Sequence, residues 1–282
     1  RQAGLTSIKC YGSSMSFANH MKELKGVLGV ETFVSDHSIK VFYDKSVLTD
    51  EEIKKAIFTP VSSIVAPPAQ GLSSVAVAEA AIDQFFDPND AMLLEIRFKQ
   101  VKGILAFETV FGEPVHALIY FDSRLLNTDK IKQLIEEEKL KWAFEGETYE
   151  AETDFKVTSI RLKEEAISLS AYLSLKYEPV VLDFNDFESY QPSQLDSLDV
   201  PFIDGADPEL TDMPWYLLSH LSNEKGVVRF ATLFTDNGMV LRLTYSPALT
   251  GKEQIMNLLN QPDLHVHMSD GTEKSMPNPY RF

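Results

Sequence analysis

Cysteine is nearly absent from this chain of 282 residues, because Cys10 is the only one. A single cysteine excludes an intramolecular disulfide framework and fits either a reducing or an oxidising compartment. No apolar run reaches the about 18 residues that a membrane-spanning helix requires. The P-loop, the dinucleotide-binding glycine motif, the serine-hydrolase elbow and the H-E-x-x-H zinc motif are also missing. The sequence therefore predicts neither a membrane span nor an enzyme.

Basic residues are scarce relative to acidic ones, with 26 Lys and Arg against 42 Asp and Glu, for a net charge of −16. The imbalance is unevenly distributed: residues 1–66 carry 8 basic and 7 acidic groups, whereas residues 73–150 carry 8 and 15. Residues 151–282 carry 10 and 20. Because such a surface repels phosphate backbones, nucleic acid is not an expected partner. The first part of the chain is electrostatically distinct from the rest.

The chain does contain an internal repeat. A pattern that begins with Lys-Gly followed by apolar residues occurs three times, each time leading into an apolar, aromatic-rich run and then a helical pattern. The glycines of the pattern are Gly26, Gly103 and Gly226, which are 77 and then 123 residues apart. These distances are too long for a solenoid repeat. The sequence therefore predicts three small copies of one fold.

The first copy predicts six elements. Ser13 or Ser14 offers an N-cap hydroxyl for the first helix, and Gly26 suits the position just after that helix. Apolar residues in alternation predict a hairpin, and Asp50 starts a second helix. The expected order is strand 5–9, helix from 13–14, strands 30–34 and 39–43, helix 50–57 and strand 61–65. This order is β-α-β-β-α-β, the ferredoxin-like arrangement.

The other two copies predict the same order, with strands near 75–82, near Trp142 and at 264–268, and helices over 88–101, 128–138 and 214–222. The predicted fold class is α+β: three tandem ferredoxin-like βαββαβ modules, with antiparallel sheets and helices packed on one face. We name three segments after these predictions, with a linker at 67–72 and an insert of uncertain structure at 151–196. They are the first segment (1–66), the second segment (73–150) and the third segment (197–282).

The first segment resembles the heavy-metal-associated domain of copper chaperones, mercury-binding proteins and metal-pumping ATPases. The residues that carry the resemblance are 9–13, 24–27, 41–44, Leu48, Thr49, Ile53, Ala56 and Ile57. In that family a C-x-x-C pair precedes the first helix and binds a soft metal such as Cu(I). Here the two ligand positions hold Cys10 and Ser13, so Ser13 stands where the second ligand has been lost. The resemblance implies Cu(I), Hg or Zn binding or transfer through Cys10. A lone cysteine would need further sulfur from Met15, a second chain or a partner's cysteine pair. The other interpretations are that Cys10 is a remnant without a ligand role, or that it serves redox capping or intermolecular pairing.

The corresponding positions of the other segments lack sulfur pairs. The second segment has Asp87 and Asp90, and the third has Leu210 and Met213. Soft metals need thiolate or thioether ligands, whereas carboxylates suit hard cations. Asp87 and Asp90 are therefore interpreted either as helix capping or as a hard-cation site. The sequence predicts no certain cofactor.

The six histidines allow limited interpretation. His265 and His267 flank one residue in a predicted strand, so their side chains share a face. They are interpreted either as a surface copper or zinc clip or as solvent-facing residues. His20 and His220 each lie six residues before the glycine of their segment, which indicates a shared, exposed position on a helix. His116 is interpreted as isolated, as is His37.

Two further groups are interpreted as structural. Phe85-Phe86 and Trp215-Tyr216 are expected in cores or packing contacts. The run 136–138 of three glutamates is expected to be a solvated helix end.

The sequence supports two functional hypotheses. The first is a non-catalytic binding or interaction protein built from degenerate heavy-metal-associated domains, an accessory module of a metal-handling system with a protein partner such as a metal transporter or chaperone. The alternative is soft-metal binding or transfer through Cys10. The start at Arg1 and the sparse cysteine favour an exported, periplasmic protein, and a cytosolic arm of a transporter is the alternative location.

Overall fold

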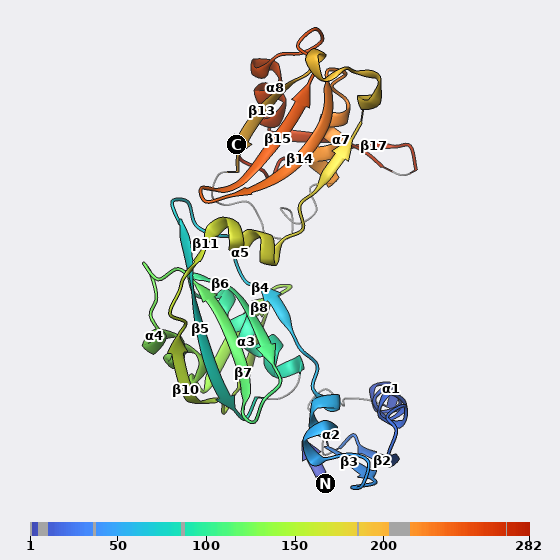
Figure 1. Cartoon of the computed structure of the whole chain (residues 1–282), viewed down its shortest axis with the longest axis vertical. Helices are drawn as coiled ribbons and strands as arrows, with labels where there is room; N and C mark the ends of the chain where they lie inside the picture. Colours follow the sequence, from blue (N-terminus) through green and yellow to red (C-terminus); the bar gives the residue numbers. More distant parts are fainter. Residues whose placement is uncertain are drawn as a thin grey trace. The chain divides into compact units, whose positions relative to one another are not determined.

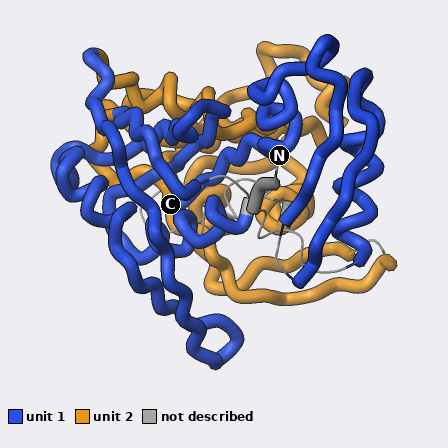
Figure 2. The backbone as a smooth tube through the Cα atoms, turned by 90° about the horizontal axis from the view of Figure 1, so that it is seen from below, with its two compact units in different colours: residues 1–65, 77–164 blue, residues 66–76, 165–282 orange. Residues whose placement is uncertain are grey.

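The computed structural model is a mixed α+β protein with several antiparallel sheets (Figure 1). It divides into two compact units, residues 1–65 with 77–164, and residues 66–76 with 165–282 (Figure 2). The predictions for Cys10, His37, Asp87, Leu210 and Met213 fall outside the described residues. The residues that the structure describes are 2–4, 11–35, 38–85, 88–184, 186–202, 215–268 and 270–282.

The first segment contains a small sheet with two helices. Its sheet has the order β1-β3-β2, and all neighbours are antiparallel. Met21 and Ile53 from the two helices pack against Ile39 and Val41 of β3, so both helices cover one face of the sheet. The elements are β1 (Gln2–Gly4), α1 (Tyr11–Lys22), β2 (Val27–Phe33), β3 (Ser38–Tyr43) and α2 (Asp50–Ile57).

The second segment contains two helices and contributes strands to a larger sheet, whose order is β10-β5-β7-β6-β4. Two of these strands come from outside the second segment. Strand β4 (Ser62–Ile64) belongs to the first segment, and β10 (Lys156–Leu162) belongs to the insert. The remaining elements are β5 (Ser74–Asp83), α3 (Pro88–Lys99), β6 (Ile104–Val110), β7 (Val115–Phe121), α4 (Thr128–Ile135), and the hairpin of β8 (Lys139–Phe144) and β9 (Glu147–Glu152).

The third segment forms a sheet with the order β12-β14-β15-β13, and its first strand again comes from the insert. Leu217 and Leu221 of α7 and Ile255 of α8 pack in the core with Phe230 of β14. The insert supplies β11 (Ile167–Ser168), α5 (Leu169–Lys176), β12 (Val181–Asp183) and two 3-10 turns, Phe187–Ser189 and Pro192–Gln194. The third segment supplies β13 (Asp196–Pro201), α7 (Trp215–Ser222), β14 (Val227–Thr235), β15 (Gly238–Tyr245), α8 (Lys252–Leu259), β16 (Asp263–His267) and β17 (Glu273–Pro277).

The repeated sequence produces the same local hydrogen bonds in all three segments. The carbonyl oxygens of Gly26, Gly103 and Gly226 each accept a backbone N–H at 2.8 Å, from residues 44, 122 and 246 respectively. Gly26 and Gly103 have φ of 104° and 107°, a conformation that favours glycine. A register shift in the following hairpin also falls at the same place in each segment, between residues 27 and 29, 104 and 106, and 227 and 229.

Two sequence predictions about the first segment need correction. Helix α1 begins at Tyr11, so Ser13 and Ser14 lie inside the helix and neither is its N-cap. The strand predicted at 61–65 exists as β4, but it pairs with β6 rather than with the sheet of its own segment. Strand pairing between distant residues is not visible in local periodicity, which explains the second error.

The last strands predicted for the second and third segments are also present but differently placed. The strand near Trp142 is β8, which pairs with β9 in a two-stranded sheet, while β10 lies beside β5. Strand β16 pairs with β17 as a two-stranded sheet. Its Leu264 and Val266 still pack into the core of the third segment. No helix among the described residues combines the length and the apolar character that crossing a bilayer requires.

Candidate functional site

The predicted soft-metal position lies at the start of α1. Cys10 itself is outside the described residues, and the helix begins at the next residue, Tyr11. Ser13 is half-buried in the first turn, and Met15 is 41% exposed. The unpaired N–H groups of a first helical turn favour a thiolate next to them. The assignment of Cys10, Ser13 and Met15 as a metal site stays a prediction.

The second predicted site is on β16, where exposed and buried residues alternate. His265 and His267 are exposed and Val266 between them is buried, which places the two histidines on one face of the strand. Their backbone N–H groups bind α7: that of His265 donates to His220 Nδ1 at 3.0 Å, and that of His267 donates to Ser219 Oγ at 2.8 Å. Helix α7 therefore holds β16 through side-chain acceptors.

His220 is buried, with only 2% of its surface exposed, so the prediction of an exposed position was wrong. Its Nδ1 accepts from the His265 backbone, so Nε2 carries the proton and donates to the carbonyl oxygen of Leu258 at 3.2 Å. Burial lowers the pKa of His220 below its ordinary value, and the nearby His265 ring lowers it further. His220 is thus a neutral structural residue, whereas His20 in the first segment is exposed.

The imidazole of His267 has protein partners at both nitrogens. Nε2 lies 2.6 Å from Asn223 Oδ1, and Nδ1 lies 3.4 Å from Glu273 Oε1. Over the described part of the chain, no group of three or more His, Cys, Asp or Glu side chains is arranged to hold a metal ion. A metal clip at His265 and His267 remains a prediction without a third ligand among these residues.

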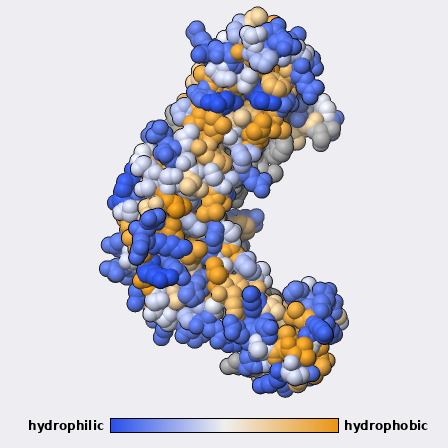
Figure 3. All heavy atoms as spheres, viewed as in Figure 1, coloured by the Kyte–Doolittle hydropathy of each residue, from blue (hydrophilic) through white to orange (hydrophobic). Residues whose placement is uncertain are grey.

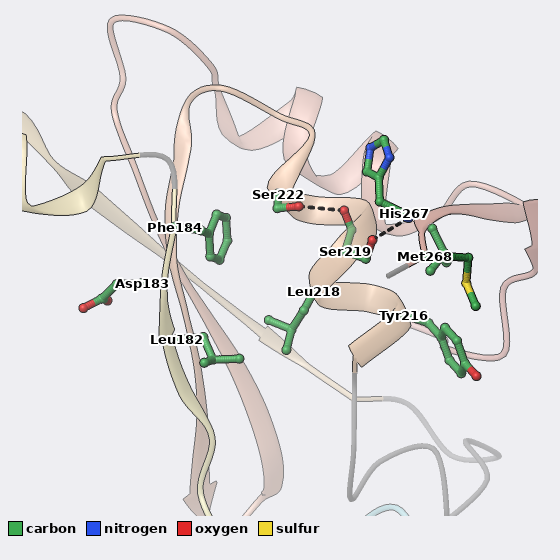
Figure 4. Close-up of a pocket in the computed structure, with 10 residues that line it drawn as sticks. Leu182, Asp183, Phe184, Tyr216, Leu218, Ser219, Ser222, His267 and Met268 are labelled. Carbon is green, nitrogen blue, oxygen red and sulfur yellow. Dashed lines mark hydrogen bonds between the residues drawn. The ribbon is translucent and has the colours of Figure 1, made fainter. Parts of the chain in front are cut away.

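A groove of about 440 Å³ lies beside this strand, between β12, α7 and β16 (Figure 4). Leu182, Phe184 and Leu218 point into it, while Asp183 points away and pairs with Arg229. Its other lining residues are Tyr216, Ser219, Ser222, Val266, His267 and Met268.

The two serine hydroxyls of this groove are occupied by structural hydrogen bonds. Ser219 Oγ accepts from the backbone of His267, and Ser222 Oγ donates to the Ser219 carbonyl oxygen at 2.8 Å. The His267 ring binds Asn223 rather than either hydroxyl. A serine nucleophile with a histidine base is therefore not assembled by these side chains. The groove is an apolar surface feature.

Three of the exposed apolar side chains of the first segment lie on its β2–β3 hairpin. Leu28 is 75% exposed, Phe33 39% and Phe42 40%. Ile39 and Val41 of β3 enter the core, so Phe42, which alternates with them, lies on the opposite face of the sheet. Phe33 is on that face too, because its register partner Ser38 alternates with Ile39. Figure 3 shows apolar side chains on the visible side of the first segment.

Sequence reasoning predicted the hairpin but missed this surface. The signal was Phe42, an apolar residue of β3 that alternates with Ile39 and Val41 and so lies on the other face of the sheet. A sheet covered by helices on one side needs only one apolar face. Phe42 therefore needed a second explanation.

Two strands of the protein, each the first strand of its hairpin, pair with an additional strand on the side away from the hairpin partner. Strand β6 pairs with β4, and β14 pairs with β12, both antiparallel. Each added strand follows a Pro-Val pair, Pro60-Val61 before β4 and Pro179-Val180 before β12. This repeated dipeptide is a second signal in the sequence, because it precedes both added strands.

The remaining predictions have mixed outcomes. Phe85 is buried and packs edge-to-face against Phe155 at 5.3 Å, as predicted for a core residue. Tyr216, predicted in the same way, is instead 38% exposed. Glu136 is not merely a solvated helix end, since its carboxylate accepts the N–H of Val157 at 3.0 Å. His116 is not isolated, because its Nδ1 lies 3.1 Å from Glu79.

A scan of the chain against models of known protein families finds no match, and no curated protein sequence matches it significantly.

Proposed function

We propose that this chain is a non-catalytic protein-interaction protein built from three copies of a βαββαβ unit related to the heavy-metal-associated domain. The order β10-β5-β7-β6 around the second segment supports the ferredoxin-like assignment, because β10, which follows the second helix after the β8–β9 hairpin, lies beside the first strand β5. The shared glycine hydrogen bonds of the three segments support a common origin. Ser13 occupies the position of the second cysteine, which supports a role that does not depend on a pair of thiolates.

The observation that carries the interaction role is the exposed apolar surface of the first segment. Of the large apolar side chains exposed in the described chain, six belong to the first segment and only two to the third. Phe33 and Phe42 share the sheet face that the helices leave uncovered. Exposed apolar side chains on one face of a nearly neutral segment fit a protein contact. We place the partner in a metal-handling system, in an exported setting or, alternatively, at a cytosolic transporter arm.

The test is affinity enrichment from the native host with the full chain as bait. The double variant Phe33→Gln, Phe42→Gln removes both aromatic rings from the proposed surface. Leu175→Gln with Leu249→Gln is the matched control, because these side chains are 57% and 55% exposed elsewhere in the chain. We expect a protein that is recovered by wild type and control and lost, by at least about tenfold, with the phenylalanine variant. Equal recovery with all three baits would contradict the proposal.

Soft-metal binding through Cys10 is the alternative, favoured by the start of α1 at the adjacent Tyr11. A lone thiolate loses the effective concentration of a C-x-x-C pair, which is worth roughly 10²–10⁴ in affinity. Titration of Cu(I) into wild type and Cys10→Ser decides this alternative. Stoichiometric binding that Cys10→Ser abolishes would support it, whereas identical curves would remove it.

A further inference from the structure

The edge of β6 shows how this protein holds an added strand. The backbone N–H of Val61 donates to Thr109 Oγ1 at 2.8 Å, and the N–H of Thr109 donates to the Val61 carbonyl oxygen at 2.8 Å. Four residues later, the N–H of Val65 donates to the carbonyl oxygen of Leu105, again at 2.8 Å. The strand is thus fixed at both ends, and its first contact uses a threonine side chain as well as the backbone.

The edge of β14 holds its added strand in the same way. The Val180 N–H donates to Thr232 Oγ1 at 2.7 Å, and the Thr232 N–H donates to the Val180 carbonyl oxygen at 2.9 Å. The N–H of Phe184, four residues after Val180, donates to the carbonyl oxygen of Val228 at 2.9 Å. Thr109 and Thr232 are 123 residues apart, the same distance as their glycines. Two independent edges therefore share one recognition pattern.

The occupants of these edges also share a sequence pattern. Pro60 and Pro179 precede the two valines, and an apolar residue, Val65 or Phe184, stands four positions after each valine. A proline cannot donate to a sheet, so it suits the position just before pairing begins. The shared pattern is Pro-Val-x-x-x-apolar.

Strand β2 of the first segment has the same acceptor groups at its edge. Thr32 and Leu28 stand 77 residues before Thr109 and Leu105, and the register shift after Val27 matches those of the other two hairpins. Among the described residues, the only strand that pairs with β2 is β3, on the other side. Since the backbone groups of an edge strand alternate in direction, the Thr32 N–H and the Leu28 carbonyl face outward as their counterparts do.

Residues at the corresponding edges are buried where a strand is added and more exposed at β2. Leu105 and Val228 are 2% and 0% exposed where a strand is added, whereas Leu28 is 75% exposed. Thr109 and Thr232 are buried, while Thr32 is only half-buried. The edge of β2 therefore has the hydrogen-bonding groups found at the two occupied edges, but its residues are exposed, as expected for an edge without an added strand.

We propose that the outer edge of β2 binds an extended strand of another protein chain with the pattern Pro-Val-x-x-x-apolar. The strand runs antiparallel to β2, its valine N–H donates to Thr32 Oγ1, and its final apolar residue donates to the Leu28 carbonyl oxygen. Strand addition to an open sheet edge is an established mode of peptide recognition. This inference rests on the proposed interaction function and names the partner's chemistry.

The probe for the test is a fluorescent peptide copied from residues 178–184, Glu-Pro-Val-Val-Leu-Asp-Phe, with blocked ends. It is titrated against the full chain, with fluorescence anisotropy for affinity and amide shifts in ¹H–¹⁵N spectra for location. We expect micromolar-to-millimolar binding and shifts concentrated in residues 27–33. The same peptide with an N-methylated first valine lacks the donor for Thr32 and should bind at least about tenfold more weakly.

The N-methylated peptide leaves the protein unchanged, so a folding defect cannot produce this result. Thr32→Val removes the acceptor while keeping the side-chain shape, and should weaken binding by roughly five- to tenfold. Thr148→Val, an exposed threonine on β9, is the control and should bind like wild type. A peptide with the same residues in scrambled order should not bind.

Three results would overturn the inference. One is equal affinity for the plain and N-methylated peptides. Another is amide shifts confined to β6 or β14, which would mean displacement of an internal strand. The third is a concentration-dependent dimer that perturbs residues 27–33 without peptide, which would make a second copy the occupant. If the peptide fails but the Phe33 and Phe42 variant still loses its partner, only the strand inference fails, and the proposed function stands.

Discussion

The hairpins of the first and second segments begin with nearly the same sequence but differ in how deeply their first strands are buried. Residues 25–32 and 102–109 share their lysine, glycine, leucine, glutamate and threonine positions. Yet β6 is almost wholly buried, whereas β2 alternates between exposed and half-buried residues. Leu105 is 2% exposed and its counterpart Leu28 is 75% exposed. The residues of a strand do not by themselves determine its burial.

The difference between the two hairpins lies in what surrounds them. Strand β6 lies between β7 and β4, while β2 has one described neighbour, β3. The first segment sends β4 to the sheet of the second, so its own sheet has three strands. The described sheet of the first segment therefore has an open edge at β2.

The largest effect should come from truncating the matched leucines. Leu105→Ala removes a buried side chain and should lower the free energy of unfolding by about 2–5 kcal/mol. Leu28→Ala removes an exposed one and should change it by less than about 0.5 kcal/mol. Calorimetry of both variants checks the pair. Equal destabilisation would mean that Leu28 is buried in solution and would break the comparison.

The matched threonines should show a smaller difference. Thr109→Val leaves the N–H of Val61 without its side-chain acceptor and should cost about 1–3 kcal/mol. Thr32→Val, at the open edge, should cost less than about 0.5 kcal/mol in the absence of a partner. Native-state hydrogen exchange at Val61 and Thr32 gives the local opening free energies. Slow exchange at Thr32 in the isolated chain would show that the β2 edge is already covered.

Local sequence patterns predicted most individual elements, because they depend on periodicity and on turn residues close in the chain. The helix at Thr128–Ile135 and the strand at Ser74–Asp83 lie within the predicted ranges or extend them by one residue. What failed was pairing between distant parts of the chain. The destination of β4, and the use of 156–162 from the insert as a neighbour of β5, depend on contacts that local patterns do not encode.

The candidate sites show the same limit. His20 and His220 occupy the same place relative to their glycines, so the sequence predicted the same exposure. In the third segment, β16 packs on α7 and buries His220, whereas the first segment has no described counterpart of β16. The burial of a helix face depends on a strand that follows about 45 residues later. The Pro-Val pairs, by contrast, were readable from sequence and predict where the added strands begin.

His220 should make the third segment sensitive to acid in a way that the first is not. Because burial lowers the pKa of His220 in the folded state, the unfolded state binds this proton more readily. Its contribution to stability is complete above its ordinary pKa of 6.5 and is lost as the pH falls below that value. Urea unfolding between pH 7.5 and about 5 should therefore show a loss that His220→Gln reduces.

The control for this pH effect is His20→Gln, which changes an exposed side chain of the first segment. It should leave the slope of stability against pH unchanged. A slope that survives in His220→Gln but disappears in His20→Gln would reverse the assignment.

The smallest effect concerns the second helix of each segment, which differs at its N-cap. Thr49 and Asn127 accept first-turn N–H groups of α2 and α4, whereas Gly251 before α8 has no side chain to do so. Gly251 has φ −130° and ψ 166°, which any residue adopts, and a Cβ there meets nothing within 4 Å. Gly251→Ser should therefore stabilise the third segment by a few tenths of a kcal/mol. Gly251→Ala supplies the Cβ without the hydroxyl and should not stabilise the segment. The measurement is hydrogen exchange in α8. If exchange slows equally in both variants, the gain comes from reduced entropy of the unfolded chain rather than from capping.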